Sequence, residues 1–334
     1  MADALLSPAV GGTMLVVSAA ALAVAVKKSG AGTLDEKKIP LMGIMGAFVF
    51  AAQMINFTIP ATGSSGHIGG GVLLAALLGP WPAFITLAVV LLIQCLFFAD
   101  GGLLAYGCNV FNMGFVSALA AWVFVYRPFL GGKKLSPGRL ALTSFLTVVA
   151  GLQLGAFCVV LETTLSGVAE LPFSAFALLM QPIHLAIGAV EGAATAAVLV
   201  FVYRFRPEII KNPLENKNIP RAVSIKKIAV LFIVLSAAAA GLFSLFASSY
   251  PDGLEWSMEN TAGTTELERE SKIHELSGSL ADSAPMPGYA FKNDAENPAG
   301  TAAAGLAGSL VTVIAAGGIG LAIAALRARQ KSAR

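Results

Sequence analysis

The sequence contains nine apolar runs, and most of them are close to the roughly 20 residues that a helix needs to cross a bilayer. They span residues 9–26, 40–58, 67–79, 82–98, 103–125, 140–160, 183–203, 228–247 and 301–326. Hydrophobic residues make up 56% of the chain and charged residues only 12%, which is too apolar for a soluble domain of this size. We therefore expect an all-α fold, a polytopic membrane helix bundle of about nine transmembrane helices.

The basic residues indicate how this bundle is oriented. Of the 22 Lys and Arg residues, 19 lie within 27–39, 126–139, 204–227 and 327–334, which share one side if all nine runs cross. Because Lys and Arg are enriched in cytoplasmic loops, the N-terminus is expected outside and the C-terminus in the cytoplasm. The short run 67–79 then crosses as well, since a re-entrant half-helix there would move segment 126–139 to the outside.

Charge and proline divide the chain into two modules. Residues 1–205 hold about seven of the predicted transmembrane helices. The basic segment 206–227 contains three prolines and is expected to be a cytoplasmic linker. Residues 228–334 form the second module, with two transmembrane helices and an outer loop, 248–300, that carries ten acidic residues.

One stretch, 172–203, is too long for a single span. Pro182 lies inside it, and a proline in a helix interior removes a hydrogen bond and clashes with the preceding turn. We therefore expect a short interfacial or packed helix over 173–180 and a separate span over 183–203.

A glycine-rich turn over residues 59–71 carries a single histidine, His67. Non-helical backbone at membrane depth is tolerated only where protein buries it or water fills the space, so the turn suggests a site. Histidine is both a common metal ligand and an ordinary loop residue, so a flexible loop is the alternative. The polar residues expected to line a pocket at this level are Gln53, Asn56, Asn109 and Ser65.

Small residues recur at every fourth position in the first two runs. They are Ala19 and Ala23 in the first run and Gly43, Ala47 and Ala51 in the second. Small residues four apart let helix backbones approach closely in lipid. The pattern favours helix docking on these faces, either inside the protein or against another subunit.

Two further ionisable residues, His184 and Glu191, are seven positions apart and so share one helix face. An ionisable residue within a membrane span is a functional candidate, but a structural hydrogen bond is an equally good interpretation of Glu191. His274 lies in the acidic outer loop and is expected to be a surface residue.

The residues also allow two other classes of function. An ion-coupled secondary transporter would use Glu191 and need no ATPase partner. An intramembrane serine hydrolase would pair Ser64 or Ser65 with His67 or His184, and would need an oxyanion hole. The chain has no G-x-x-x-x-G-K-[ST] motif, so it cannot hydrolyse ATP through a P-loop.

Four segments together resemble the CbiM/NikM family. They are Gly46–Phe57, Gly63–Gly70, Asn109–Gly114 and His184–Gly192. Members of this family are the substrate-binding S components of energy-coupling factor transporters for cobalt and nickel. The second module, with Pro251-Asp252-Gly253-Leu254-Glu255, looks like the PDGLE-type, NikN-like small component fused to the C-terminus.

The resemblance implies a multi-pass protein of a prokaryotic cell membrane that imports Ni(II) or Co(II), the latter for cobalamin biosynthesis. It implies a transmembrane coupling (T) subunit and two separate ATPase subunits as partners, and a transporter component rather than an enzyme. No catalytic residue, permanent cofactor or nucleic acid is expected. The fused module is expected to shape or gate the outer metal site.

The resemblance also implies four nitrogen ligands for the metal. They are the N-terminal amine, the backbone nitrogen and imidazole of a histidine at position two, and the histidine that matches His67. This sequence begins Met1-Ala2-Asp3 and lacks the position-two histidine. We hypothesise that the start was assigned two residues late, after a Met-His pair. Otherwise the Met1 amine would bind beside His67, with Asp3 or water completing a weaker site.

Overall fold

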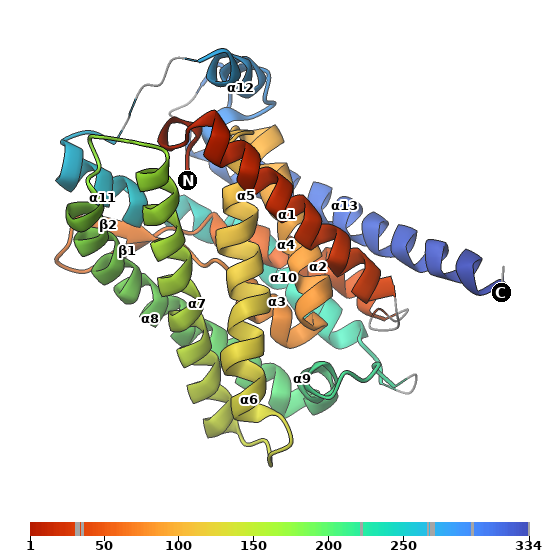
Figure 1. Cartoon of the computed structure of the whole chain (residues 1–334). Coiled ribbons are helices and arrows are strands. Elements are labelled where there is room, and N and C mark those ends of the chain that lie inside the picture. The colour runs from red at the N-terminus through yellow and green to blue at the C-terminus, as the bar shows by residue number, and fades with distance from the viewer. Residues whose placement is uncertain are drawn as a thin grey trace.

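The computed structural model describes residues 1–30, 34, 37–220, 223–265, 267, 271–294 and 297–332. Within this part of the chain, seven helical segments are long and apolar enough to cross a membrane. They are α1 (Pro8–Lys28), α4 (Pro80–Phe98), Tyr106–Leu130 with α5 (Tyr106–Asn109) and α6 (Arg127–Leu130), α7 (Pro137–Leu165), α8 (Phe173–Phe205), Lys226–Phe246 with α10 (Lys226–Gly241), and α13 (Pro298–Ser332). The predicted membrane helix bundle is confirmed (Figure 1).

The other two predicted crossings are shorter than a bilayer-spanning helix. The second run forms α2, Lys38–Gln53, and the third forms α3, Gly71–Leu78. Eight helical residues rise only about 12 Å, and residues 67–70 of the same run are not helical. The number of crossings, predicted as nine, therefore stays a prediction.

The division of residues 172–203 at Pro182 was wrong. The structure has one continuous helix, α8, with Pro182 inside it. Helix-breaking residues are tolerated in membrane helices because neighbouring side chains satisfy backbone groups. Next to the proline, Gln153 of α7, which packs along α8, donates to the carbonyl oxygen of Gln181 at 2.9 Å and so ties this part of α8 to its neighbour.

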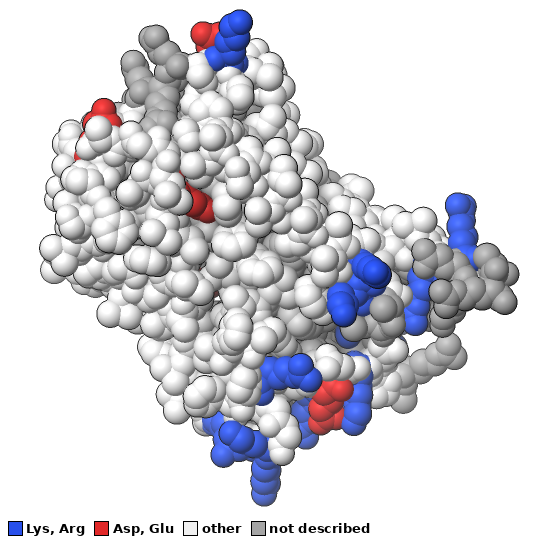
Figure 2. Space-filling model, viewed as in Figure 1, with Lys and Arg blue, Asp and Glu red and all other residues white. Residues whose placement is uncertain are grey.

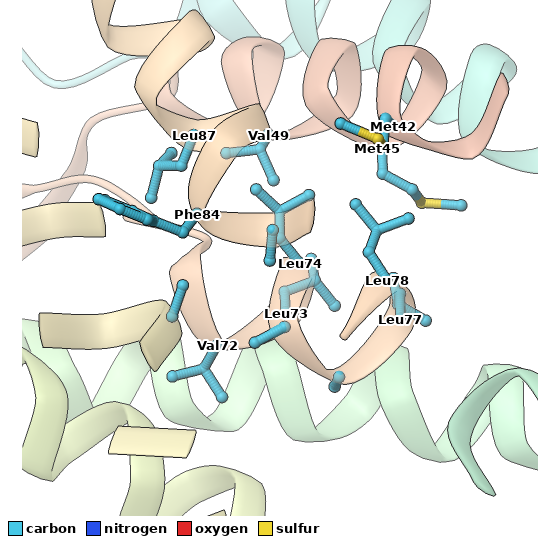
Figure 3. Packing of buried hydrophobic residues seen from close by; sticks show 14 of the residues in the cluster. Met42, Met45, Val49, Val72, Leu73, Leu74, Leu77, Leu78, Phe84 and Leu87 are labelled. Carbon is cyan, nitrogen blue, oxygen red and sulfur yellow. The ribbon is translucent and has the colours of Figure 1, made fainter. Parts of the chain in front are cut away.

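Helix α3 lies in the centre of the bundle, and all eight of its residues are buried. Figure 3 shows its leucines between Met42, Met45 and Val49 of α2 and Phe84 and Leu87 of α4. At its C-terminal end, Gly79 lies next to Pro213 of α9, Pro207–Leu214. The predicted linker thus contains a helix whose Ile209 and Ile210 are buried in the main core.

The second module packs against the first through α2. A Cβ atom on Gly43 would lie 2.7 Å from the Val313 carbonyl oxygen of α13. Ser309 of α13 donates to the Ala47 carbonyl oxygen at 3.4 Å, and Ala51 packs against buried alanines of α10. The small residues of α2 therefore serve internal packing. By contrast, Ala19 and Ala23 of α1 are exposed.

Charge is segregated between the two ends of the bundle. Lys and Arg gather at the end that carries α6 and α9 and toward the C-terminus (Figures 1 and 2). The N-terminus lies at the opposite end, beside α11 (Gly253–Ala262) and α12 (Lys272–Asp282). This arrangement is the one assumed in predicting that the N-terminus faces outward.

Replacing Gly43 by Ala tests the contact between α2 and α13. The added methyl group would collide with backbone of α13, so we expect the variant to lose about 1–3 kcal/mol of stability. Gly317→Ala is the matched control, because a Cβ atom there meets nothing within 4 Å on the same α13. Thermal unfolding in detergent measures both, and equal midpoints for the two variants would contradict this packing.

Candidate functional site

A short β-hairpin presents His67. Strand β1, Phe57–Ile59, pairs antiparallel with β2, Ser64–Gly66, with Thr58 opposite Ser65. The turn between the strands uses left-handed backbone at Gly63, where φ is 74°. Residues 67–70 follow as a non-helical segment and lead into α3, with left-handed backbone at Gly70, where φ is 78°. His67 is therefore held between a hairpin and the start of a buried helix.

Buried side chains satisfy backbone groups of this non-helical segment. The Gly70 amide donates to Oε1 of Glu191 on α8 at 2.9 Å. Gln53 of α2 donates through Nε2 to the Gly69 carbonyl oxygen at 3.0 Å. Gln94 of α4 in turn donates to Oε1 of Gln53 at 2.7 Å. Three helices thus fix the segment that carries His67.

The N-terminal segment approaches His67 from the other side. The Asn109 side chain donates to the Met1 carbonyl oxygen at 3.1 Å. Leu5 and Leu6 anchor the following residues, because both are fully buried. The Asp3 carboxylate does not line the space beside His67. It instead accepts a hydrogen bond from the Ala105 amide at 2.6 Å. Of the two alternatives for completing a weaker site, Asp3 or water, Asp3 is therefore engaged elsewhere in this structure.

Two cavities meet at His67. One has a volume of about 330 Å³ and is lined by Gln53, Asn56 and Gln94. The other has a volume of about 130 Å³ and reaches Glu191 and His184. The lining residues common to both cavities are Met1, His67, Asn109, Met113 and Asp252. The structure thus brings Met1, Gln53, Asn56, His67 and Asn109 together around the larger cavity, whereas Ser65 of the expected set lies outside it.

The imidazole of His67 has unused binding capacity. Its Nδ1 atom is buried and has no hydrogen-bond partner among the residues that the structure describes. A buried polar atom without a partner is costly, and a bound ion or water would satisfy it. Within the same described residues, no group of three or more His, Cys, Asp and Glu side chains forms a metal cluster. A bound metal would therefore need other donors, such as the N-terminal amine.

The PDGLE motif packs directly on the hairpin. The Ser65 amide donates to the Pro251 carbonyl oxygen, and its hydroxyl donates to that of Tyr250, both at 2.8 Å. Trp256 donates through Nε1 to the Thr62 carbonyl oxygen at 2.9 Å. Ser65 lines neither cavity and instead joins the two modules. Because these serine hydroxyls bond to backbone carbonyls, the structure offers the serine-hydrolase alternative no support.

The sequence analysis missed two acidic residues of the motif that line the larger cavity, Asp252 and Glu255. Asp252 caps α11 by accepting from the Leu254 and Glu255 amides at 2.8 and 2.9 Å. Burial and the neighbouring Asp252 carboxylate raise the pKa of Glu255. The D-x-x-E spacing is that of a capping box and could have predicted the start of α11, but not its position beside His67.

The hydrogen bonds of His184 and Glu191 give both residues a structural role. Nδ1 of His184 is 2.8 Å from the Met180 carbonyl oxygen one turn earlier in α8. Glu191 holds the Gly70 amide at the N-terminus of α3. A carboxylate is favourable at that position because the helix dipole places positive charge there. This structural interpretation of Glu191 was one of the two alternatives.

Replacing Glu191 by Ala tests its hold on the His67 segment. The Gly70 amide would lose its buried acceptor, which costs about 1–3 kcal/mol. We expect faster hydrogen exchange at residues 69–72 and a lower unfolding midpoint. Glu191→Gln keeps one acceptor oxygen and should have a smaller effect. Wild-type exchange rates in Glu191→Ala would contradict the assignment.

Comparison with known proteins identifies two parts of the chain. Residues 1–209 match the CbiM family, described as the cobalt uptake substrate-specific transmembrane region, and residues 226–325 match the PDGLE domain. A solved structure described as a transition metal transporter shares 32% sequence identity and has a TM-score of 0.54. The match covers 62% of this chain and 94% of the chain in the solved structure.

Named relatives agree with this result. A putative fused nickel transport protein NikMN of Archaeoglobus fulgidus is 33% identical over 93% of this chain and 94% of its own length. A probable fused nickel transport protein LarMN of Lactiplantibacillus plantarum is 33% identical over 69% of this chain and 72% of its own. The cobalt transport protein CbiM of Geobacter sulfurreducens is 37% identical over 51% of this chain and 49% of its own. The chain therefore belongs to the CbiM family, as a multi-pass membrane component of metal transport that carries a C-terminal PDGLE domain.

Proposed function

We propose that this chain is the substrate-binding S component of an energy-coupling factor transporter that imports Ni(II) or Co(II). The ion is captured between His67 and the amine of the N-terminal segment, at the outer end of the bundle. The observation that carries this proposal is the buried Nδ1 atom of His67, which has no hydrogen-bond partner among the described residues. His67 and Met1 both line the two cavities. Nitrogen donors of this kind suit Ni(II) and Co(II).

The charges around the site support capture of a cation from outside. Asp252 lines both cavities, and Glu255 and Asp100 line the larger one. Acidic groups at the mouth of a cleft raise the local concentration of cations and steer them inward. The basic residues at the opposite end favour a cytoplasmic location there, which supports an outward-facing His67.

ATP hydrolysis would reside in two separate ATPase subunits, joined to this chain by a transmembrane T subunit. The absence of a P-loop motif requires such partners if transport uses ATP. The exposed small residues of α1, including Ala19 and Ala23, offer a face for close helix contact with the T subunit.

Nickel is the favoured substrate. Two fused relatives, which match 93% and 69% of this chain, are named as nickel transport proteins. Nitrogen sites generally bind Ni(II) more tightly than Co(II), in line with this choice. Competition between the two ions for the purified protein distinguishes them.

Removing the His67 imidazole tests the capture site directly. His67→Ala should abolish retention of Ni(II) and Co(II) by the purified chain, because the principal side-chain nitrogen is lost. Thr58→Ala is a control in the same hairpin, since Thr58 lines neither cavity. Isothermal titration with a C-terminally tagged protein measures both variants. Wild-type affinity in His67→Ala would overturn the proposal.

Adding a Met-His dipeptide ahead of Met1 tests the role of the N-terminal nitrogens. The added residues supply an amine, an amide nitrogen and an imidazole, and the cavity of about 330 Å³ beside Met1 has room for them. We expect Ni(II) to bind at least tenfold more tightly, a gain of about 1.4 kcal/mol. A Met-Ala dipeptide is the matched control. Equal affinities for the two extensions would argue against nitrogen ligation at this end.

A further inference from the structure

Helix α12 of the second module contacts the N-terminal segment through His274. Its Nε2 atom lies 3.1 Å from the Asp3 carbonyl oxygen and 3.2 Å from that of Leu6. Its Nδ1 atom is 2.6 Å from the Ser271 hydroxyl, at the N-cap of α12. Two carbonyl acceptors require a proton on Nε2, so His274 donates to the N-terminal segment. His274, expected to be a surface residue, is therefore half-buried and in contact with the N-terminal segment.

A second residue of α12 reaches the same segment one turn later. The hydroxyl of Ser277, which is buried, donates to the Asp3 carboxylate. The same hydroxyl accepts from the Leu103 amide at 3.1 Å. Asp3 also accepts from the Ala105 amide at 2.6 Å, and its own amide donates to the Gly101 carbonyl oxygen at 2.8 Å. Three parts of the chain therefore meet at Asp3: the N-terminal segment, the loop before α5, and α12.

We propose that His274 and Ser277 are positioning residues that hold Asp3 and Leu6, and so place the N-terminal amine opposite His67. We call these four residues the N-terminal latch. The inference rests on the proposed function and names the part of the second module that acts on the metal site. The latch supplies no metal ligand, because both ring nitrogens of His274 are engaged in hydrogen bonds.

The latch acts by pre-organisation. A chain end that is free to move must be ordered when it binds an ion, and that ordering opposes binding. Leu5 packs among Val160, Phe176 and Met258, while the latch fixes the polar side of the same turn. With the turn already ordered, less conformational freedom is lost when the amine meets the metal.

The latch also predicts coupling in both directions. If docking of α12 favours the metal-binding arrangement of the N-terminal segment, then a bound metal must equally favour docking of α12. Ni(II) at His67 should therefore slow hydrogen exchange in residues 272–282, although α12 lines neither of the two cavities. If His274 only stabilised α12, binding of Ni(II) at His67 would not slow hydrogen exchange in residues 272–282.

Hydrogen exchange of the metal-free, full-length protein is the first measurement. In His274→Ala, the amides of Asp3, Leu5 and Leu6 should exchange at least tenfold faster than in the wild type. Ser277→Ala should show the same direction of change. Ser279→Ala is the matched control, because Ser279 is an exposed serine on the same helix. Unchanged exchange in His274→Ala would overturn the latch.

Titration with Ni(II) alone is the second measurement. His274→Ala should bind at least tenfold more weakly, and Ni(II) should no longer protect residues 272–282 in that variant. The effects of Asp3→Ala and Ser277→Ala on Ni(II) affinity should be non-additive. The double variant should bind Ni(II) no more weakly than whichever single variant has the lower affinity. Faster exchange at the N-terminus with unchanged Ni(II) affinity would overturn the positioning role.

Failure of the proposed function has a different signature. It would appear as wild-type Ni(II) affinity in His67→Ala, whatever the exchange rates of the N-terminal segment. Failure of the latch appears as an effect of His67→Ala without any effect of His274→Ala. The two variants together therefore separate the two claims.

Discussion

The hydrogen bonds that satisfy residues 67–70 determine much of this structure. A non-helical segment in an apolar bundle has backbone groups that lack helical hydrogen-bond partners and that lipid cannot satisfy. Glu191 and the Gln53–Gln94 pair provide those partners from α8, α2 and α4. The polar side chains that are costly in a membrane are thus needed to keep His67 on a fixed, non-helical backbone. Among the described residues, the Nδ1 atom of His67 itself has no hydrogen-bond partner.

The second module contacts both segments that carry the proposed ligands. The PDGLE motif binds the hairpin before His67, through Ser65 and Trp256. Helix α12 binds the turn after Met1. The module is anchored against α2 by α10 and α13, where glycine and alanine permit close backbone contact. A fused arrangement keeps these contacts in one chain, so they form without the entropic cost of bringing two proteins together.

The sequence predicted the fold class and the neighbourhood of His67 better than it predicted local geometry. The lengths of the apolar runs were sufficient to predict a membrane helix bundle, because a helix must have a minimum length to cross the lipid bilayer. Gln53, Asn56 and Asn109 were correctly grouped with His67, since polar residues at one membrane depth tend to share a protein interior. Pro182 was misleading because a proline is tolerated inside a membrane helix and need not end it.

Other features lay beyond single-sequence reasoning because they depend on contacts between distant segments. The contact of His274 with Asp3 and Leu6 joins residues 271 and 268 positions apart, and no local pattern signals it. Asp252 was recognisable as a turn residue, but its place between two cavities follows from how α11 packs on α8 and β2. The structural role of Glu191 depends likewise on an amide 121 residues away.

Helix α3 has a mechanical consequence for transport. One of its ends is tied to Glu191 beside His67, and the other lies against Pro213 of α9, at the opposite side of the bundle. A buried helix in a close-packed interior resists compression, so it moves as a rigid rod. Helix α3 therefore forms a packed connection between α9 and the segment that carries His67. Because a close-packed interior transmits strain, such a connection joins the surface at α9 to the proposed metal site in both directions.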